Sequence, residues 1–290
     1  MKKIKILIPI YNDWKSVFKL LENINSEVSI LGNEFSVIII NDASNEKRPE
    51  FSFKVDNIRS IKVINMKKNR GHARCNASGL KYIIDNEEFD YVIPMDGDGE
   101  DRPEEIKEFI DNLNYSQDIP TVGERTKRSE GLFFKLCYLT HKIITIVFTG
   151  QSIKFGNYTL LPKSIVKKMV NEKATWSSFS GSLAKVAKDR ATSSSERGTR
   201  YFGPSKMSFK NLIAHSLSII SVFKKSVLLR SVLFLLVYMF LIHQNITVIM
   251  LIPIILVLAL ITSVFVVSGR ENLDELNNSL ENVNNIENLK

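Results

Sequence analysis

The stretch YVIPMDGDGEDRPE, from Tyr91 to Glu104, decides the fold class and the place of the site. Its apolar start, Tyr91–Met95, ends in four acids within six positions: Asp96, Asp98, Glu100 and Asp101. The apolar run predicts a buried strand of an α/β sheet, with the acids on the loop at its carboxyl end, where such sheets bind ligands. Crowded carboxylates repel one another, and Mg²⁺ or Mn²⁺ would relieve that repulsion. A solvated acidic turn before a helix is the alternative, because Pro103 suits a first helical position.

Strand-like and helix-like segments alternate through the first part of the chain. The strand-like runs are Lys3–Ile10, Phe35–Ile40, Ile58–Ile64 and Tyr91–Met95, and the helical patterns are Trp14–Ile24, His72–Ile84 and Arg102–Leu113. This order predicts an α/β fold with a mostly parallel sheet covered on both faces. Polar loops at Asp42 and Asp96 then meet at one sheet edge. The sequence has no GxGxxG and no GxxxxGK[ST], so it lacks the main signatures of dinucleotide and P-loop sites.

Composition points to anionic partners. The 290 residues carry a formal charge of +8 and only two cysteines, Cys75 and Cys137, which are not in metal-binding spacing. Residues 119–235 hold 20 Lys or Arg against 5 Asp or Glu, an excess of 15. The basic charge is therefore concentrated in the second half, next to an apolar C-terminal region. Such a flank attracts anionic headgroups, so we expect no nucleic-acid partner.

The C-terminal third predicts membrane insertion. Val227–Val267 contains a single charged residue, Arg230. One helix of that length would be about 60 Å long, twice a bilayer core, so we expect two spans, Val227–Ile242 and Ile246–Val267. A buried helical hairpin of a soluble protein is the alternative. Basic residues flank the pair of spans and are absent between them, which predicts a multi-pass protein of the cell (inner) membrane with its catalytic domain in the cytoplasm.

Four ordered motifs carry a family resemblance. They are Pro9-Ile10-Tyr11-Asn12, Asn41-Asp42-Ala43-Ser44, the run from Asn69 to Gly79, and Met95 to Asp101. Together they resemble the family-2 glycosyltransferases of GT-A fold, and more narrowly the dolichyl/polyprenyl-phosphate sugar transferases, whose pattern is PxYNE, DDxS, NxGxxxAxxxG and DADLQxPPE. The departures are Asn41 for the first acid, Gly97 for Ala, and Glu100-Asp101 after the DxD pair.

The resemblance implies roles for individual residues. Those implied for the nucleotide are Pro9, Tyr11, Asn12, Asp42, Arg70 and Asp96. Those implied for the divalent metal, Mg²⁺ or Mn²⁺, are Asp96 and Asp98, with Glu100 as a candidate third ligand. Asp101 is either a base or a helix cap. The cation would stabilise the diphosphate that leaves from a UDP- or GDP-sugar.

Two basic motifs predict where the acceptor binds. Gly123-Glu124-Arg125 resembles the family's GxR, and Arg200-Tyr201-Phe202-Gly203-Pro204-Ser205-Lys206 resembles its RxxGxSK. The residues expected at the acceptor phosphate are Arg125, Lys135, Arg200, Ser205 and Lys206, and Arg125, Arg200 and Lys206 are also expected to take part in catalysis. Arginine and lysine suit phosphate oxygens.

An absence of acids favours a phosphate acceptor. Glu172 is the one acidic residue between Gly131 and Lys188. A hydroxyl acceptor needs a general base, whereas a phosphate monoester is already ionised at pH 7. We therefore predict an inverting transfer to undecaprenyl or dolichyl phosphate. Transfer to a hydroxyl of a lipid-linked or cell-surface glycan is one alternative, and a catalytically silent membrane scaffold is another.

The remaining segments complete the expected layout. We expect Phe155–Tyr158 to be a turn or to line the site, Ala191–Gly198 to be a flexible loop, and the four histidines and Trp176 to be structural. The tail, Glu271–Lys290, has apolar residues at helical spacing, which favours a helix and is compatible with a homo-oligomer. The expected domains are a GT-A domain at 1–206 (nucleotide-binding half 1–118, acceptor half 119–206), interfacial amphipathic helices at 207–226, two transmembrane helices at 227–268, and a cytoplasmic tail helix at 269–290.

Overall fold

The computed structural model describes residues 1–114, 118–127, 132–204 and 208–290. The chain divides into two compact units. The sheet unit comprises Met1–Ser129, Phe155–Lys206 and Asn272–Lys290, and the helical unit comprises Glu130–Lys154 and Met207–Glu271. Each unit therefore joins segments that are far apart in the sequence.

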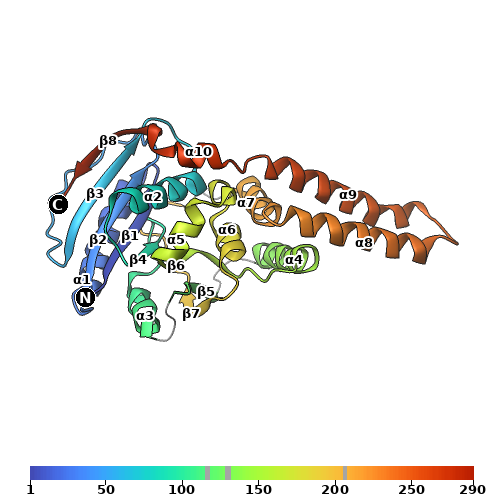
Figure 1. Cartoon of the computed structure of the whole chain (residues 1–290), viewed down its shortest axis with the longest axis horizontal. Coiled ribbons are helices and arrows are strands. Elements are labelled where there is room, and N and C mark those ends of the chain that lie inside the picture. Colours follow the sequence, from blue (N-terminus) through green and yellow to red (C-terminus); the bar gives the residue numbers. More distant parts are fainter. Residues whose placement is uncertain (115–117, 128–131, 205–207) are drawn as a thin grey trace. The chain divides into compact units, whose positions relative to one another are not determined.

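The sheet unit is organised around a twisted sheet (Figure 1). Within the described residues, its eight strands lie in the order β7-β5-β6-β4-β1-β2-β3-β8. Their bounds are β1 Lys3–Ile10, β2 Glu34–Asn41, β3 Ile58–Met66, β4 Tyr91–Pro94, β5 Thr121–Lys127, β6 Phe155–Pro162, β7 Ala191–Glu196 and β8 Val283–Asn288. The central strands β4, β1, β2 and β3 pair in parallel, whereas β6 and β8 run antiparallel to their neighbours β4 and β3. The predicted α/β sheet with a parallel centre is confirmed.

Helices cover both faces of the parallel strands. Those of the sheet unit are α1 Trp14–Val28, α2 His72–Asn86, η1 Pro103–Glu105, α3 Ile106–Asp111, η2 Asn112–Asn114, α5 Lys163–Val170, η3 Lys173–Trp176, α6 Phe179–Val186, α10 Leu273–Asn277 and η4 Ser279–Asn282. On one face, fully buried Leu21 of α1 joins a core cluster with Ile6 and Ile8 of β1. On the other face, α2 lies so close that a Cβ on Gly79 would overlap the side chain of Leu7. Alternate residues of β1 thus fill two cores, as a strand covered on both faces requires.

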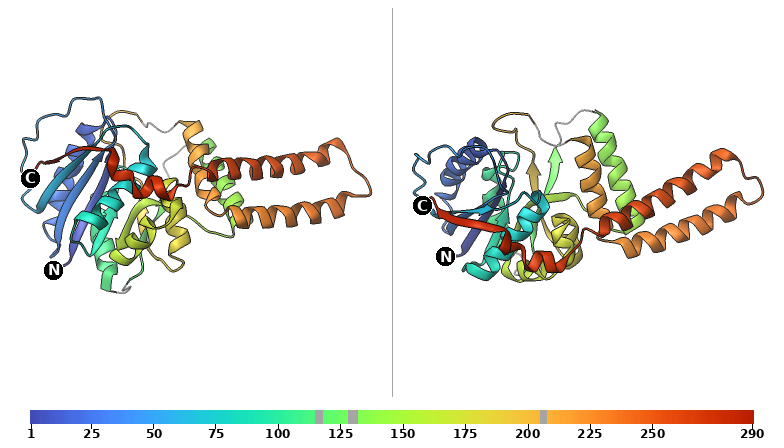
Figure 2. Two further views of the ribbon diagram at one scale, coloured as in Figure 1. Left: turned by 45° about the horizontal axis from the view of Figure 1, so that its top comes forward. Right: turned by 90° about the horizontal axis from the view of Figure 1, so that it is seen from above.

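The helical unit contains α4 Leu132–Thr149, α7 Phe209–Ser221, α8 Lys224–Ile242 and α9 Val248–Ser268. Figure 2 shows α8 and α9 as an antiparallel pair joined by a tight connection. Both are long and apolar enough to cross a membrane, and large apolar side chains such as Leu229 and Phe240 are more than 70% exposed. Arg230 of α8 has a partner within the unit, because its Nη1 donates to the Val147 carbonyl at 3.1 Å, near the end of α4. These two helices match the two predicted spans.

The prediction for Ala191–Gly198 is wrong. Ala191–Glu196 is not a flexible loop but strand β7, which pairs in parallel with β5 from Ala191 opposite Thr121. Its serines gave no hydrophobic alternation, yet Ser193 is buried and donates to Glu108 at 2.9 Å. The predicted helix Arg102–Leu113 is confirmed, with its first and last turns formed by the 3₁₀ turns η1 and η2 on either side of α3.

The tail helix is a further wrong prediction. Only Leu273–Asn277 is α-helical, and the chain then extends as β8 along the edge strand β3, with Ile286 opposite Ile64. The apolar spacing suggested one helix, but an unpaired edge of a sheet offers a row of backbone donors and acceptors that an extended segment satisfies. The C-terminal residues therefore complete the sheet rather than form a separate helical domain.

Candidate active site

The acidic loop follows β4 and folds back on itself. The backbone N–H of Asp96 donates to the Asp101 carboxylate at 2.8 Å, and that of Glu100 donates to Asp98 at 3.0 Å. Gly99 has a φ of 91°, which residues with a Cβ rarely adopt. These features hold four acids on one compact turn at the carboxyl edge of the sheet.

Asp98 is enclosed by the segment that follows β7. Arg200 Nη1 donates to Asp98 Oδ2 at 2.7 Å, and its Nη2 pairs with Asp13 beside the start of α1. The Tyr201 backbone N–H donates to the Asp98 carbonyl at 2.9 Å, and its ring lies over Gly99, where a Cβ would come within 2.6 Å. The structure thus brings the predicted acceptor residue Arg200 to the predicted metal ligand Asp98.

The carboxyl groups of this loop are electrostatically crowded. Burial and the neighbouring charge of Asp96 raise the pKa of Asp98 to about 6. The same two causes raise the pKa of Asp101 to about 7. Asp101 is only 3% exposed, and its nearest basic group is Arg125 Nη2 of β5 at 3.5 Å. The site therefore carries an excess of buried negative charge, which favours binding of a cation.

Asp96 meets two side chains from other elements. His72 Nε2, at the start of α2, lies 2.9 Å from Asp96 Oδ1, and Asn157 Nδ2 of β6 donates to the same oxygen at 3.4 Å. Although desolvation acts in the opposite direction, the charge of His72 lowers the pKa of Asp96, and Asp96 in turn raises the pKa of His72. Asp96 is therefore held ionised while Asp98 is not fully so at neutral pH.

The fit of a divalent cation differs among the three predicted ligands. Asp96 and Asp98 supply the oxygen ligands and the unbalanced charge that Mg²⁺ or Mn²⁺ requires. Glu100 instead forms an ion pair with Arg197. Across the described ranges, no three His, Cys, Asp or Glu side chains are grouped to hold a metal. The predicted three ligands are thus near in sequence, but the structure does not gather them, because Glu100 is paired with Arg197.

The predicted nucleotide residues lie on neighbouring loops at the same edge. Both carboxylate oxygens of Asp42 accept backbone N–H groups, from Arg70 and Gly71, each at 2.8 Å. Burial raises the pKa of Asp42 against these two bonds. Asp42 is only 4% exposed, and its carboxylate connects the loop after β2 to the loop before α2. Its predicted hydrogen bond to a base or ribose stays a prediction.

The first motif joins the second in the same way. Asn12, in a left-handed conformation with φ of 51°, donates its backbone N–H to Ser44 Oγ at 2.9 Å and its side-chain amide to Asn45 at 2.7 Å. Pro9 is buried within β1, whereas Tyr11 is 44% exposed. Tyr11 is therefore the more exposed of these two residues, and its predicted part in nucleotide binding stays a prediction.

Some predicted residues cannot be located. Ser205 and Lys206 lie outside the described residues, as does the side chain of Lys135. Residues that the sequence did not indicate are Asp13, His72 and Arg197. Of the basic residues that the structure sets against the acidic loop, the sequence motifs indicated Arg125 and Arg200, whereas the others become adjacent to it only through the fold.

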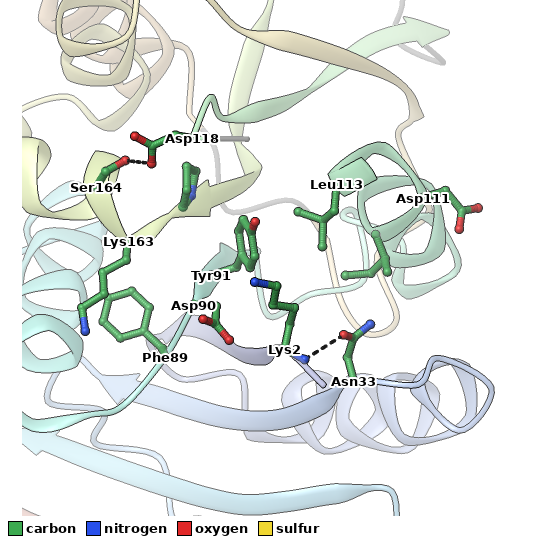
Figure 3. Close-up of a pocket in the computed structure, with 12 residues that line it drawn as sticks. Lys2, Asn33, Phe89, Asp90, Tyr91, Asp111, Leu113, Asp118, Lys163 and Ser164 are labelled. Atoms are coloured by element: carbon green, nitrogen blue, oxygen red, sulfur yellow. Dashed lines mark hydrogen bonds between the residues drawn. The ribbon is translucent and has the colours of Figure 1, made fainter. Parts of the chain in front are cut away.

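A pocket of about 640 Å³ opens at the opposite edge of the sheet (Figure 3). Its lining residues Lys2, Asn33 and Asp90 each stand just before a parallel strand, and Lys2 N donates to Asn33 Oδ1 at 3.2 Å. None of the residues predicted for the site lines this pocket. The carboxyl edge, not this pocket, therefore holds the candidate active site.

Solved structures share the fold. Glucosyl-3-phosphoglycerate synthase from Mycobacterium tuberculosis, in complex with Mn²⁺, UDP-glucose and phosphoglyceric acid, superposes with a TM-score of 0.53 at 10% identity over 78% of this chain and 80% of that one. The same enzyme in complex with Mg²⁺ and UDP gives a TM-score of 0.50 at 12% identity over 78% and 79%. These likenesses confirm the predicted GT-A-like fold.

Sequence relatives point the same way. The undecaprenyl-phosphate 4-deoxy-4-formamido-L-arabinose transferases of Salmonella paratyphi B and Salmonella enteritidis PT4 are each 26% identical over 223 residues, which is 73% of this chain and 65% of theirs. The chain thus spans somewhat less than two thirds of these relatives. The model of the family described as glycosyl transferase family 2 matches residues 5–171, more than half of the chain. The chain belongs to glycosyl transferase family 2.

Proposed function

We propose that this glycosyltransferase moves one sugar from a nucleoside diphosphate sugar to a polyprenyl phosphate at the cytoplasmic face of the membrane, with inversion at the anomeric carbon. The observation that carries the proposal is the convergence of Arg125 and Arg200, both from the predicted acceptor half at 119–206, on the acidic loop. Donor and acceptor both carry phosphate groups, and the negative charges of these groups come close together at the point of sugar transfer. Cations between them lower the barrier by offsetting that charge.

Asp96 and Asp98 would hold the divalent cation. When bound, that ion supplies positive charge to the departing diphosphate. Asp96 stays ionised because His72 balances it, and Asp98 lies beside it with a pKa of about 6. Arg200, now paired with Asp98 and Asp13, would be free to reach a phosphate once the acid has another cation.

The acceptor phosphate is supported by the state of Asp101. A sugar hydroxyl needs a base that can touch it, and Asp101 is 3% exposed and already accepts the Asp96 N–H. A phosphate oxygen is ionised and needs no base. The pKa of about 7 at Asp101 is the one feature that favours the hydroxyl alternative, because it suits a base near neutral pH.

The membrane setting supports a lipid acceptor. Helices α8 and α9 are the candidate spans, and Lys224, Lys225 and Arg270 flank their ends. By the positive-inside rule both ends face the cytoplasm. A lipid phosphate at that face would lie near the basic second half of the chain.

A donor panel tests the proposal. Purified full-length protein in lipid nanodiscs receives undecaprenyl phosphate, Mg²⁺ and, one at a time, labelled UDP- and GDP-sugars. We expect at least one donor to give label in an organic-extractable product, and the Asp98→Asn variant to give almost none. No lipid-linked product with any donor would refute the proposal.

A further inference from the structure

The segment that follows the second membrane helix reaches the nucleotide edge of the sheet unit. Asn272 caps α10, because its Oδ1 accepts the backbone N–H of Glu275 at 3.0 Å. Fully buried Leu276 packs with Ala77 of α2 and Trp176 of η3. The first turn of α10 is therefore fixed against α2, the helix whose start borders the acidic loop.

Glu275 is held in one orientation by two hydrogen bonds. Its Oε2 accepts the Trp176 indole N–H at 2.8 Å, and its Oε1 accepts the Asn272 side-chain amide at 3.1 Å. The same Oε2 lies 3.8 Å from Arg70 Nη1. Trp176 is itself only 3% exposed and carries the Arg74 guanidinium over its ring at 5.4 Å. The Glu275 carboxylate is thus held in place beside the long basic side chain of Arg70.

Arg70 is the basic residue that the Glu275 carboxylate can orient. Its backbone N–H is anchored to Asp42 at 2.8 Å, whereas its side chain is 44% exposed. A guanidinium has five N–H donors, so a single contact with Glu275 leaves others for a ligand. Fixing a long side chain before binding lowers the entropy lost when the ligand arrives.

We infer that Glu275 is a positioning residue for the donor: it orients Arg70 toward the phosphates of a bound nucleoside diphosphate. This inference rests on the proposed function, since it needs a nucleotide at this edge. It assigns the C-terminal tail a part in donor binding.

The variants separate charge from packing. Glu275→Gln keeps an acceptor for the Trp176 N–H but removes the charge. Glu281→Gln is the matched control, because Glu281 lies on the same tail with an exposed side chain. Trp176→Phe is a second variant that keeps the charge of Glu275 but removes the bond that orients it.

Binding of UDP and of GDP, each with Mg²⁺, is measured by calorimetry on the full-length protein in detergent. For the nucleotide that the wild type binds more tightly, we expect Glu275→Gln to raise Kd about two- to fivefold, as for a half-exposed ion pair. Trp176→Phe should raise Kd by less, and Glu281→Gln should leave it unchanged. In an Arg70→Ala background, Glu275→Gln should have no further effect.

The outcomes separate the two proposals. If the wild type binds and Glu275→Gln binds equally or more tightly, the positioning role is wrong and the proposed function stands. The role is also wrong if Glu275→Gln weakens binding equally in the Arg70→Ala background. If the wild type binds neither nucleotide, the proposed function fails and the inference fails with it.

Discussion

The two ends of α2 differ in how the charges of the neighbouring carboxyl groups are balanced. At its start, His72 meets the acidic loop, where burial and like charges raise the pKa of Asp98 to about 6. Just past its end, Glu87 accepts hydrogen bonds from Lys62 at 2.6 Å and Lys5 at 2.9 Å. Burial acts to raise the pKa of Glu87, but these two bonds outweigh it and lower the pKa. One end is crowded with negative charge and the other is balanced.

This difference separates a site from a structural contact. A carboxylate with two lysines gains little from a further cation and holds strands β1 and β3 to the helix end. A group of carboxylates with raised pKa values costs stability in the free protein and gains most when a cation arrives. The same helix thus joins a stabilising ion pair to a site prepared for a ligand.

The largest expected effect is at the crowded end. Asp98→Asn should reduce transfer about 100- to 1000-fold, because it removes the charge that would hold the cation at the leaving diphosphate. Its thermal midpoint should stay within error of the wild type or rise, since a buried like charge is gone. Glu281→Gln is the control, and an active Asp98→Asn enzyme would remove Asp98 from the mechanism.

The balanced end should respond in the opposite way. Glu87→Gln leaves two lysines without their carboxylate and should destabilise the sheet unit by about 2–3 kcal/mol, which lowers the thermal midpoint by about 5–10 °C. Because the folded pKa of Glu87 lies below 4.5, this stabilisation is present above that pH and is lost as pH falls through the folded pKa. Transfer per folded molecule should be unchanged. Equal midpoints at pH 7 would contradict the structural role.

The pH profile should report the crowded end. Asp98 is ionised above about pH 6 and protonated below it, so at limiting metal concentration transfer should fall about tenfold from pH 7 to pH 5. Saturating metal competes with the proton and should move this limb to lower pH. A flat profile over this range at limiting metal would show that Asp98 does not titrate there.

A smaller effect is expected at Lys62. Its side chain is 30% exposed and Lys5 remains beside Glu87, so Lys62→Met should destabilise by only about 1 kcal/mol. The thermal midpoint should fall by about 2–4 °C at pH 7. A loss as large as that of Glu87→Gln would mean that Lys5 contributes nothing to the balance.

Much of the fold could be predicted from local patterns. Strands β2 and β4 are largely apolar runs, and the stretch Val227–Val267 that forms most of α8 and α9 holds a single charge, Arg230, so burial and length identified them. Strand β7 could not be found this way, because Ser193 and Ser195 are buried without being apolar. The tail was mispredicted because its extended form depends on the free edge of β3, a partner more than 200 residues away.

The candidate site was predicted unevenly for a related reason. Acids that are clustered in the sequence, such as Asp96 and Asp98, can be recognised from the sequence alone, whereas their partners cannot. His72 becomes a neighbour of Asp96, and Arg200 becomes a neighbour of Asp98, only when the fold brings these loops to one edge of the sheet. The spacing of residues 96–101 could not reveal that Glu100 faces Arg197, which lies about 100 residues further along the chain.

The most direct test compares two acceptors that differ in one group. Purified full-length protein in nanodiscs, with Mg²⁺ and the donor that serves it best, receives either undecaprenyl phosphate or undecaprenol. The account predicts a labelled lipid from undecaprenyl phosphate that depends on Asp98, and none from undecaprenol. Equal or faster transfer to undecaprenol would contradict a phosphate acceptor and assign Asp101 the part of a base.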